Sequence, residues 1–277
     1  MKIQTNIESL QAQHKLVSRG SQSERVVEHL ASGNRISSAA DDAAGLSIST
    51  HLNANARSLD QAVRNSQDGI SLVQVAEGGM NSTGDILTRL RELAIQGSSD
   101  TIGNSERSML NREVFQLRDE IDRISNSTEY NGRKILSGNF PQPNLEVQVG
   151  IHPGHDENTL DLNRSFMNTS LYQLGLASID FSTKEKSRDH IEVIDKAISM
   201  VSRNRANLGA LMNRFQSAIS NGQNYSENLK NSKSRILDTD MALETSENTK
   251  NKILSEASIS VISQANQNPS LALRLLS

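Results

Sequence analysis

The chain has 277 residues, no cysteine, and only 3% aromatic residues. Without cysteine it has no disulfide, no thiolate nucleophile and no cysteine-ligated zinc. The formal net charge is −3 and no stretch is strongly basic, which argues against nucleic acid as a partner. A hydrophobic share of 35% with so few aromatics is low for the core of a compact enzyme. We therefore expect narrow apolar seams between helices.

The first 31 residues predict a thin amphipathic helix. Its apolar residues Ile3, Ile7 and Leu10 recur at helical spacing, but Ser, Gln and Glu occupy many other positions of the same face. Such a helix is marginal alone, because most helical stability comes from packing. The segment lacks the apolar core of a cleavable signal peptide, and no run is long and apolar enough to span a bilayer. We expect no membrane insertion and, if the chain is exported, another export route.

Residues 32–45 are polar and break this helix, and a long helix follows them. Asp41 or Asp42 is expected to cap its start, where acidic groups meet the favourable end of the helix dipole. Apolar and small residues then keep helical spacing over 52–97. Gly78 and Gly79 interrupt this pattern at a cost of about 1 kcal/mol each relative to alanine.

A second long seam runs over residues 191–236. Its members alternate spacings of three and four residues, as in a coiled coil, and we place Arg205 among them. No proline falls inside the segment. Its length nearly equals that of the 52–97 seam, so we predict that the two helices pair along their length.

The middle of the chain predicts a shorter helix and a little β-structure. Apolar residues at helical spacing over 110–124 indicate a helix that ends near Asn131-Gly132, a dipeptide that favours a tight turn. Residues 145–151 alternate apolar and polar side chains, which predicts a half-buried strand. We expect a small β-hairpin region here and no large separate domain.

The chain closes with a polar bend over 234–240 and a last helix over 242–267, which Pro269 is expected to end. The tail, residues 271–277, is very apolar for its size, which suggests burial against another copy or a partner. We expect self-association through apolar residues near both ends of the chain: Ile3, Ile7, Leu10, Val261, Ile262, Leu273, Leu275 and Leu276.

An ordered set of motifs makes the chain resemble a bacterial flagellin, the subunit of the flagellar filament. The resemblance covers residues 1–136 and 187–277, about four fifths of the chain. The motifs lie at 32–45, 64–71, 89–96, 120–124 and 130–132 in the first half, and at 205–210, 213–215, 234–240 and 264–267 in the second. The stretch 244–252 departs from the family in being unusually polar and charged.

The resemblance implies a mainly α fold: a long antiparallel helical coiled-coil rod with a small β-hairpin region, and the two termini paired as a second coiled coil. It implies three regions. Residues 1–43 and 237–277 form a terminal helical domain, 44–136 and 187–236 form the rod, and 137–186 form a short central region without a large outer domain. The terminal helices are expected to fold as the subunits polymerise, because burial must offset the entropy of ordering.

The implied function is that of a structural subunit of the extracellular filament, secreted for motility. The implied partners are many copies of the same chain, the flagellar export apparatus, an export chaperone, and the filament cap and hook-junction proteins. Two other interpretations are a hook–filament junction protein and a secreted coiled-coil binding protein. We expect no enzymatic activity and no cofactor, since no nucleophile–base pattern or phosphate-binding loop is present.

Three smaller features have a structural and a functional interpretation. Arg89, Leu93 and Glu113 match the family's epitope for a vertebrate toll-like receptor, but we take lateral subunit contacts as their main role. His152 and His155 have no further clear ligand for a metal, and we expect plain surface residues. Asp238 and Asp240 lack the glycine and distal glutamate of a calcium loop and are expected to be cap or bend residues. No His-Glu-x-x-His zinc-protease motif occurs.

Overall fold

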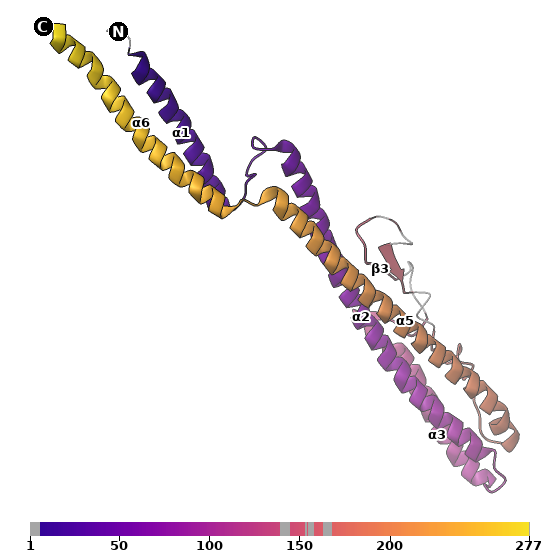
Figure 1. Cartoon of the computed structure of the whole chain (residues 1–277). Coiled ribbons are helices and arrows are strands. Elements are labelled where there is room, and N and C mark those ends of the chain that lie inside the picture. Colours follow the sequence, from indigo (N-terminus) through magenta and orange to yellow (C-terminus); the bar gives the residue numbers. More distant parts are fainter. Residues whose placement is uncertain (1–5, 139–144, 153, 155–157, 163–167, 277) are drawn as a thin grey trace. The chain divides into compact units, whose positions relative to one another are not determined.

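The computed structural model describes residues 6–138, 145–152, 154, 158–162 and 168–276 (Figure 1), with the backbone alone for 268–276. Five α-helices and two two-stranded sheets make up its regular structure in this part of the chain. The helices are α1 (Ile7–Ser32), α2 (Ala43–Gly97), α3 (Asn104–Ser127), α5 (Lys184–Leu237) and α6 (Met241–Leu276). The mainly α fold predicted from the sequence is confirmed. No helix in these ranges combines the length and the apolarity that a membrane span requires.

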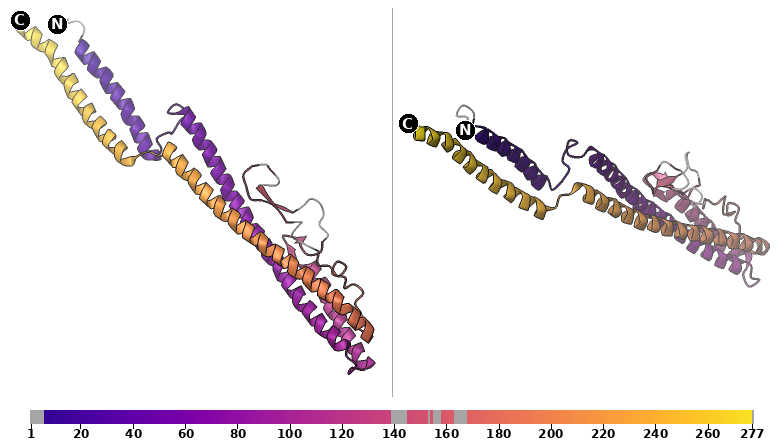
Figure 2. Two further views of the ribbon diagram at one scale, coloured as in Figure 1. Left: turned by 45° about the vertical axis from the view of Figure 1, so that its right-hand side comes forward. Right: turned by 45° about the horizontal axis from the view of Figure 1, so that its top comes forward.

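The chain divides into two compact units. Unit 1 comprises Met1–Ala56 and Glu227–Ser277, and unit 2 comprises Arg57–Ser226. In unit 1, α1 and α6 lie side by side and antiparallel in every view, so the predicted pairing of the termini is confirmed (Figure 1, Figure 2). In unit 2, the corresponding parts of α2 and α5 run antiparallel with α3 beside them.

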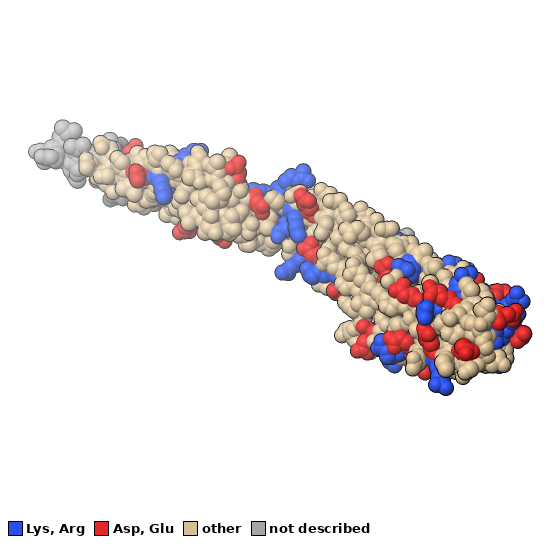
Figure 3. Space-filling view, turned by 90° about the horizontal axis from the view of Figure 1, so that it is seen from below, with Lys and Arg blue, Asp and Glu red and all other residues tan. Residues whose placement is uncertain are grey.

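The core of unit 2 lies between its three helices. Large apolar side chains from each helix are fully buried there, among them Leu90, Ile121 and Phe215. Residues 174–181, which link the central region to α5, add Leu176 and Phe181 to the same core. Sequence periodicity had placed no core residue in this linker. On the face shown in Figure 3, Lys and Arg are intermixed with Asp and Glu over the outside of unit 2.

Contacts between α2 and α5 within unit 2 fix the register of the predicted long pair. Arg91 Nε donates to Asp195 Oδ1 at 2.7 Å, and Ser226 Oγ donates to Asp60 Oδ1 at 2.7 Å. The predicted seam residues of α5 are buried or half-buried, with one correction. Arg205 is exposed, and the neighbouring Asn204 occupies the seam, because the buried stripe of this turn runs from Val201 through Asn204 to Leu208.

Two short hairpins follow α3. β1 (Glu129–Tyr130) pairs with β2 (Arg133–Lys134) across Asn131 and Gly132, whose φ angles are 51° and 75°. Two positive φ values are what a type I′ turn requires, so the predicted tight turn is confirmed. β3 (Glu146–Gln148) pairs with β4 (Thr159–Asp161), and Val147 is half-buried between exposed Glu146 and Gln148, as the alternation predicted.

Packing explains one of the two glycines that were predicted to weaken α2. The helix continues through Gly78 and Gly79 without a break. A Cβ atom on Gly79 would come within 2.7 Å of Leu136 Cδ1 and 2.9 Å of Thr128 Oγ1. The missing side chain therefore lets the segment after α3 approach the α2 backbone closely.

Several predicted helix boundaries move. Pro269 does not end the last helix, because α6 continues to Leu276; the fixed φ of proline is compatible with a helix even though its nitrogen donates no hydrogen bond. The bend predicted over 234–240 is shorter, since α5 extends to Leu237. Of the two candidate caps of α2, it is Asp42 whose Oδ1 accepts from Gly45 N at 2.9 Å, whereas Asp41 accepts from Ser37 N and Ser38 N in the preceding loop.

Candidate functional site

The helix α1 leaves several of its large aliphatic residues exposed, although Val26 is buried and Leu16 and Leu30 are half-buried. Its buried residues include Ser9 and Ala12, and Ala12 is 8% exposed. By contrast, Val17 is 72% exposed. The large aliphatic residues exposed on α1 are Ile7, Leu10, Val17 and Val27. These exposed residues give α1 an apolar surface that the described residues of unit 1 leave uncovered.

The helix α6 likewise exposes several aliphatic residues while it buries polar ones. Glu244, Asn251 and Ala265 are buried, whereas Leu243 is 63% and Ile253 is 60% exposed. The exposed apolar residues along α6 are Met241, Leu243, Ile253, Ile259 and Val261. Both terminal helices thus expose many aliphatic side chains, while the residues buried or half-buried on them include small and polar ones together with Val26, Leu254 and Ile262.

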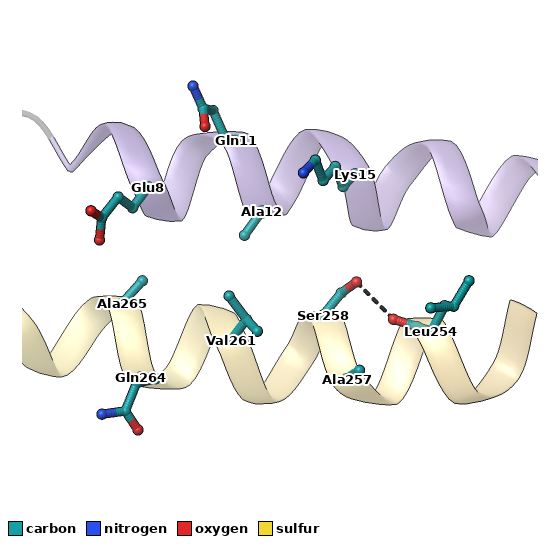
Figure 4. A pocket seen from close by; sticks show the side chains of 10 residues that line it. All are labelled: Glu8, Gln11, Ala12, Lys15, Leu254, Ala257, Ser258, Val261, Gln264 and Ala265. Atoms are coloured by element: carbon teal, nitrogen blue, oxygen red, sulfur yellow. Dashed lines mark hydrogen bonds between the residues drawn. The ribbon is translucent and has the colours of Figure 1, made fainter.

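A groove of about 510 Å³ lies between the two helices near the chain ends. In Figure 4, Ala12 of α1 faces Val261, Ser258 and Ala265 of α6, while Gln11 and Gln264 point away from the gap. Ser258 Oγ donates to the Leu254 carbonyl of its own helix at 2.7 Å and makes no bridge to α1. The small side chains therefore leave a groove at positions where the larger side chains of a coiled coil would pack.

Polar contacts tie the other end of the α1 and α6 pair. His29 Nδ1 lies 2.8 Å from Glu244 Oε1, and both side chains are largely buried. The Thr239 hydroxyl donates to the same Glu244 oxygen at 3.3 Å. The two segments that connect the helices also pair, since Arg35 N donates to the Leu237 carbonyl at 2.7 Å and Thr239 N to the Gly33 carbonyl at 3.1 Å. These bonds set the register of the terminal helices.

The predicted self-association residues fall into three groups. Ile7, Leu10 and Val261 are each at least half exposed. Ile262 is half-buried, on the stripe that also contains Ser258 and Ala265. Ile3 and the side chains of Leu273, Leu275 and Leu276 lie outside what the structure describes. The sequence did not single out Val17, Ile253 or Ile259 for self-association, although each of them is more exposed than Ile7 and Leu10.

The three epitope residues do not share one surface. Arg89 Nε donates to Glu113 Oε1 at 3.0 Å, which joins α2 and α3, and Arg89 Nη1 donates to Glu92 Oε2 at 3.0 Å. The Glu92 and Glu113 carboxylates raise the pKa of the Arg89 guanidinium by accepting these bonds. Leu93 is fully buried in the core of unit 2.

The residues considered as metal ligands either have structural roles or lie outside any described group of possible ligands. Asp240 caps α6, since its Oδ1 accepts from Ala242 N at 2.9 Å and from Leu243 N at 3.2 Å. Asp238 forms an isolated antiparallel bridge with Asn34. His152 is exposed, and His155 lies outside the described residues. Within the described ranges, no group of three or more His, Asp or Glu is placed to hold a metal ion.

Comparisons with known proteins agree with this arrangement. Residues 3–141 match the family model described as the bacterial flagellin N-terminal helical region, and residues 191–276 match the C-terminal helical region. The flagellin of Halalkalibacterium halodurans is 40% identical over 276 residues, which cover all of both chains. A crystal structure of Bacillus cereus flagellin is 27% identical, with a TM-score of 0.51 over 57% of this chain and 88% of that one. A structure from Vibrio parahaemolyticus, described as flagellar hook-associated, shares the fold at 14% identity, with a TM-score of 0.59 over 72% of this chain and all of that one.

Proposed function

The chain belongs to the bacterial flagellin family, and we propose that it polymerises through α1 and α6, whose folding is completed by neighbouring subunits. It is a structural subunit of the extracellular flagellar filament. The observation that carries the proposed mechanism is the set of large aliphatic residues that α1 and α6 leave exposed within one chain.

The free-energy balance of the terminal pair favours this mechanism. Burying one aliphatic side chain contributes about 1.5–3 kcal/mol, whereas ordering one residue costs about 1–2 kcal/mol in backbone entropy. Inside one chain, α1 and α6 bury Ala12, Val26 and Ala265 but leave Val17 and Ile253 in water. The pair therefore gains too little to order itself, and neighbours that cover the aliphatic residues supply the missing burial.

The same surface favours an open polymer over a closed oligomer. α1 and α6 each present aliphatic residues of their own, so one subunit offers two different apolar surfaces to its neighbours. Contacts between unlike surfaces do not have to close, and they generate a helical filament when the rotation between subunits leaves no ring.

Paired glutamine substitutions test this mechanism. Ile253→Gln with Ile259→Gln removes two exposed aliphatic groups, and we expect the purified chain to stop forming sedimentable filaments. The matched control is Glu256→Gln with Ser260→Gln, which changes exposed polar residues on the same turns and should polymerise like the parent. Electron microscopy and sedimentation provide the readout, with circular dichroism to verify that unit 2 stays folded. Filament formation by the Ile253 and Ile259 variant at the parental concentration would overturn the mechanism.

We propose further that the functional boundaries lie at 43/44 and 236/237, with 137–186 as a short central region. The hydrogen bonds between residues 33–35 and 237–239 support these boundaries, because they tie together the two connections that leave the terminal helices. A fragment of residues 44–236 should then unfold cooperatively on heating yet never polymerise. A fragment without a cooperative transition would contradict the boundaries.

The remaining partners are proposals that rest on the family. They are the export apparatus, an export chaperone, the filament cap and the hook-junction proteins, and a toll-like receptor that reads the surface near Arg89 and Glu113. The family is one of structural proteins, and we propose that this chain has no catalytic activity. Full-length similarity to a named flagellin favours a filament subunit over a hook–filament junction protein, although the fold is common to both classes. Long filaments under the electron microscope would distinguish them.

A further inference from the structure

A polar cavity of about 600 Å³ lies in unit 1, between α1, the segment that follows it and α6. Its basic residues come from all three elements: Arg19 and Arg25 from α1, Arg35 from the segment before α2, and Lys250 from α6. Its acidic residues are Asp41, Glu244 and Glu247. Four cations therefore line the cavity together with three carboxylates.

Two of the three carboxylates are engaged by donors of unit 1. Asp41 Oδ2 accepts from Ser37 N at 3.1 Å and from Ser38 N at 2.8 Å, within the segment between α1 and α2. Glu244 Oε1 lies 2.8 Å from His29 Nδ1. These contacts occupy acceptor oxygens that the cations of the cavity would otherwise use.

The cations of the cavity have no carboxylate partner among the described residues. Arg35 Nη2 donates to the Ile236 carbonyl at 2.6 Å, and Arg19 Nη1 donates to a glutamine side chain at 3.0 Å. Arg25 and Lys250 form neither a hydrogen bond nor an ion pair with a described residue. Most of the donors of these four side chains are therefore available to a ligand.

The side chain of Asn251 adds a neutral donor to the same cavity. It is 6% exposed and lies on the buried and half-buried stripe of α6 that also contains Glu244 and Asn248. It makes no hydrogen bond with a described residue. A largely buried amide without a partner costs free energy, and a ligand in the cavity that accepts from its amide group would remove that cost.

We propose that this cavity binds a free multivalent oxyanion of the phosphate class through Arg25, Lys250 and Asn251. A guanidinium presents a planar fork of donors that fits the oxygens of such an ion, and an ammonium adds a compact positive charge. Because the donors come from both α1 and α6, an ion with several oxygens can accept from the two helices through separate atoms. The inference goes beyond the filament role proposed above, since it assigns a ligand to unit 1.

Uptake of inorganic phosphate by filaments of the full chain tests the site. Filaments are pelleted at a series of radiolabelled phosphate concentrations, with the ionic strength held constant by sodium chloride, and bound phosphate per subunit is counted. The parent should show saturable uptake of about one phosphate per subunit, because the cavity is a single site. Arg25→Gln with Lys250→Gln should need on the order of tenfold more phosphate for half-saturation. Lys250→Gln alone, at an exposed position, is the second variant should the double variant form no filaments.

A matched control removes the same charge outside the cavity. Arg235→Gln with Lys252→Gln changes exposed residues of unit 1 that do not line it, and uptake should equal that of the parent. The site is overturned if parental filaments show no saturable uptake, or if the control loses as much affinity as the cavity variant. Neither result touches the filament role, because the filaments themselves are present. Equilibrium dialysis of dissociated chains is the second arm: binding there as well would retain the site and contradict the coupled folding proposed above.

Discussion

Two helix pairs in this chain use the same spacing but differ in how many of their large apolar side chains they bury. In unit 2, α2 and α5 bury Leu90 and Phe215 completely. In unit 1, α1 and α6 bury Ala12 and Glu244 and leave Val17 in water. The first allocation stabilises a single chain, whereas the second leaves the apolar surface for other chains. Heptad spacing alone therefore does not tell which pair folds within one subunit.

The substitution with the largest expected effect removes a core side chain of unit 2 and tests this difference between the two helix pairs. Phe215 is fully buried, with its ring against Gly69 of α2. Phe215→Ala should lower the free energy of unfolding by about 3–5 kcal/mol, because it removes apolar contacts and leaves a cavity. Urea unfolding followed by circular dichroism measures the change. Tyr225→Ala, at a half-exposed position of the same helix, should cost far less, and equal costs would contradict the contrast.

A buried cation fixes the turn between α2 and α3. Arg107 is 7% exposed and donates from Nε to the Gly97 carbonyl at 3.0 Å and from Nη2 to the Ser99 carbonyl at 2.8 Å. Arg107→Ala should cost about 2–3 kcal/mol in the same unfolding experiment, since it leaves buried carbonyls unpaired at the end of α2. Arg107→Lys should recover only part of this loss, because a lysine is not a planar fork. Full recovery by lysine would show that charge alone matters.

The difference between the two helix pairs explains how much of each unit the sequence predicts. The α2 and α5 seams could be read directly, since apolar residues at spacings of three and four do face each other there. That Asn204 and not Arg205 occupies the seam could not be predicted, because both residues are polar and only packing decides which of them is buried. The linker residues Leu176 and Phe181 have no periodicity to reveal their burial.

The terminal site was harder to predict. Ile7, Leu10 and Val261 are exposed in the single chain, and their contact with other copies stays a prediction. The seam through Asn248 and Asn251 was missed because a rule that turns apolar residues toward the partner helix assigns the polar stretch to solvent. Its 4-3 spacing from Glu244 onward was the available signal.

A hydrogen bond that is lost in acid offers a further test of whether unit 2 folds by itself. Lys186 Nζ lies 2.6 Å from Asp180 Oδ2, and this hydrogen bond, with those from Ser182, lowers the pKa of Asp180 to about 2. The unfolded value is about 3.9, so the carboxylate contributes stability of about 2 kcal/mol above that pH, which is lost as the pH falls toward 2.

Asp180→Asn tests this contribution. Unfolding in urea at a series of pH values should show a smaller free energy of unfolding at neutral pH and a weaker decline between about pH 4 and pH 2 than in the parent. Ser182→Ala, which removes a lesser hydrogen bond to the same carboxylate, should keep most of the decline. An unchanged pH profile in Asp180→Asn would mean that other carboxylates govern acid unfolding.

The substitution with the smallest expected effect on the stability of a single chain compares the two units most directly. Val261 is 57% exposed on α6, and Val261→Ala should alter the free energy of unfolding of the dissociated chain by less than about 0.5 kcal/mol. The same substitution removes two methyl groups from a surface that neighbours cover, which should raise the concentration needed for polymerisation by on the order of tenfold. Sedimentation over a concentration series measures that threshold. A core substitution of similar size, Val201→Ala, should do the reverse, with a clear loss of unit 2 stability and a smaller shift of the threshold, because Val201 is buried within unit 2. If both variants shifted the two quantities alike, the terminal helices and unit 2 would share one folding transition, and the division between surfaces that fold the chain and surfaces that join chains would fail.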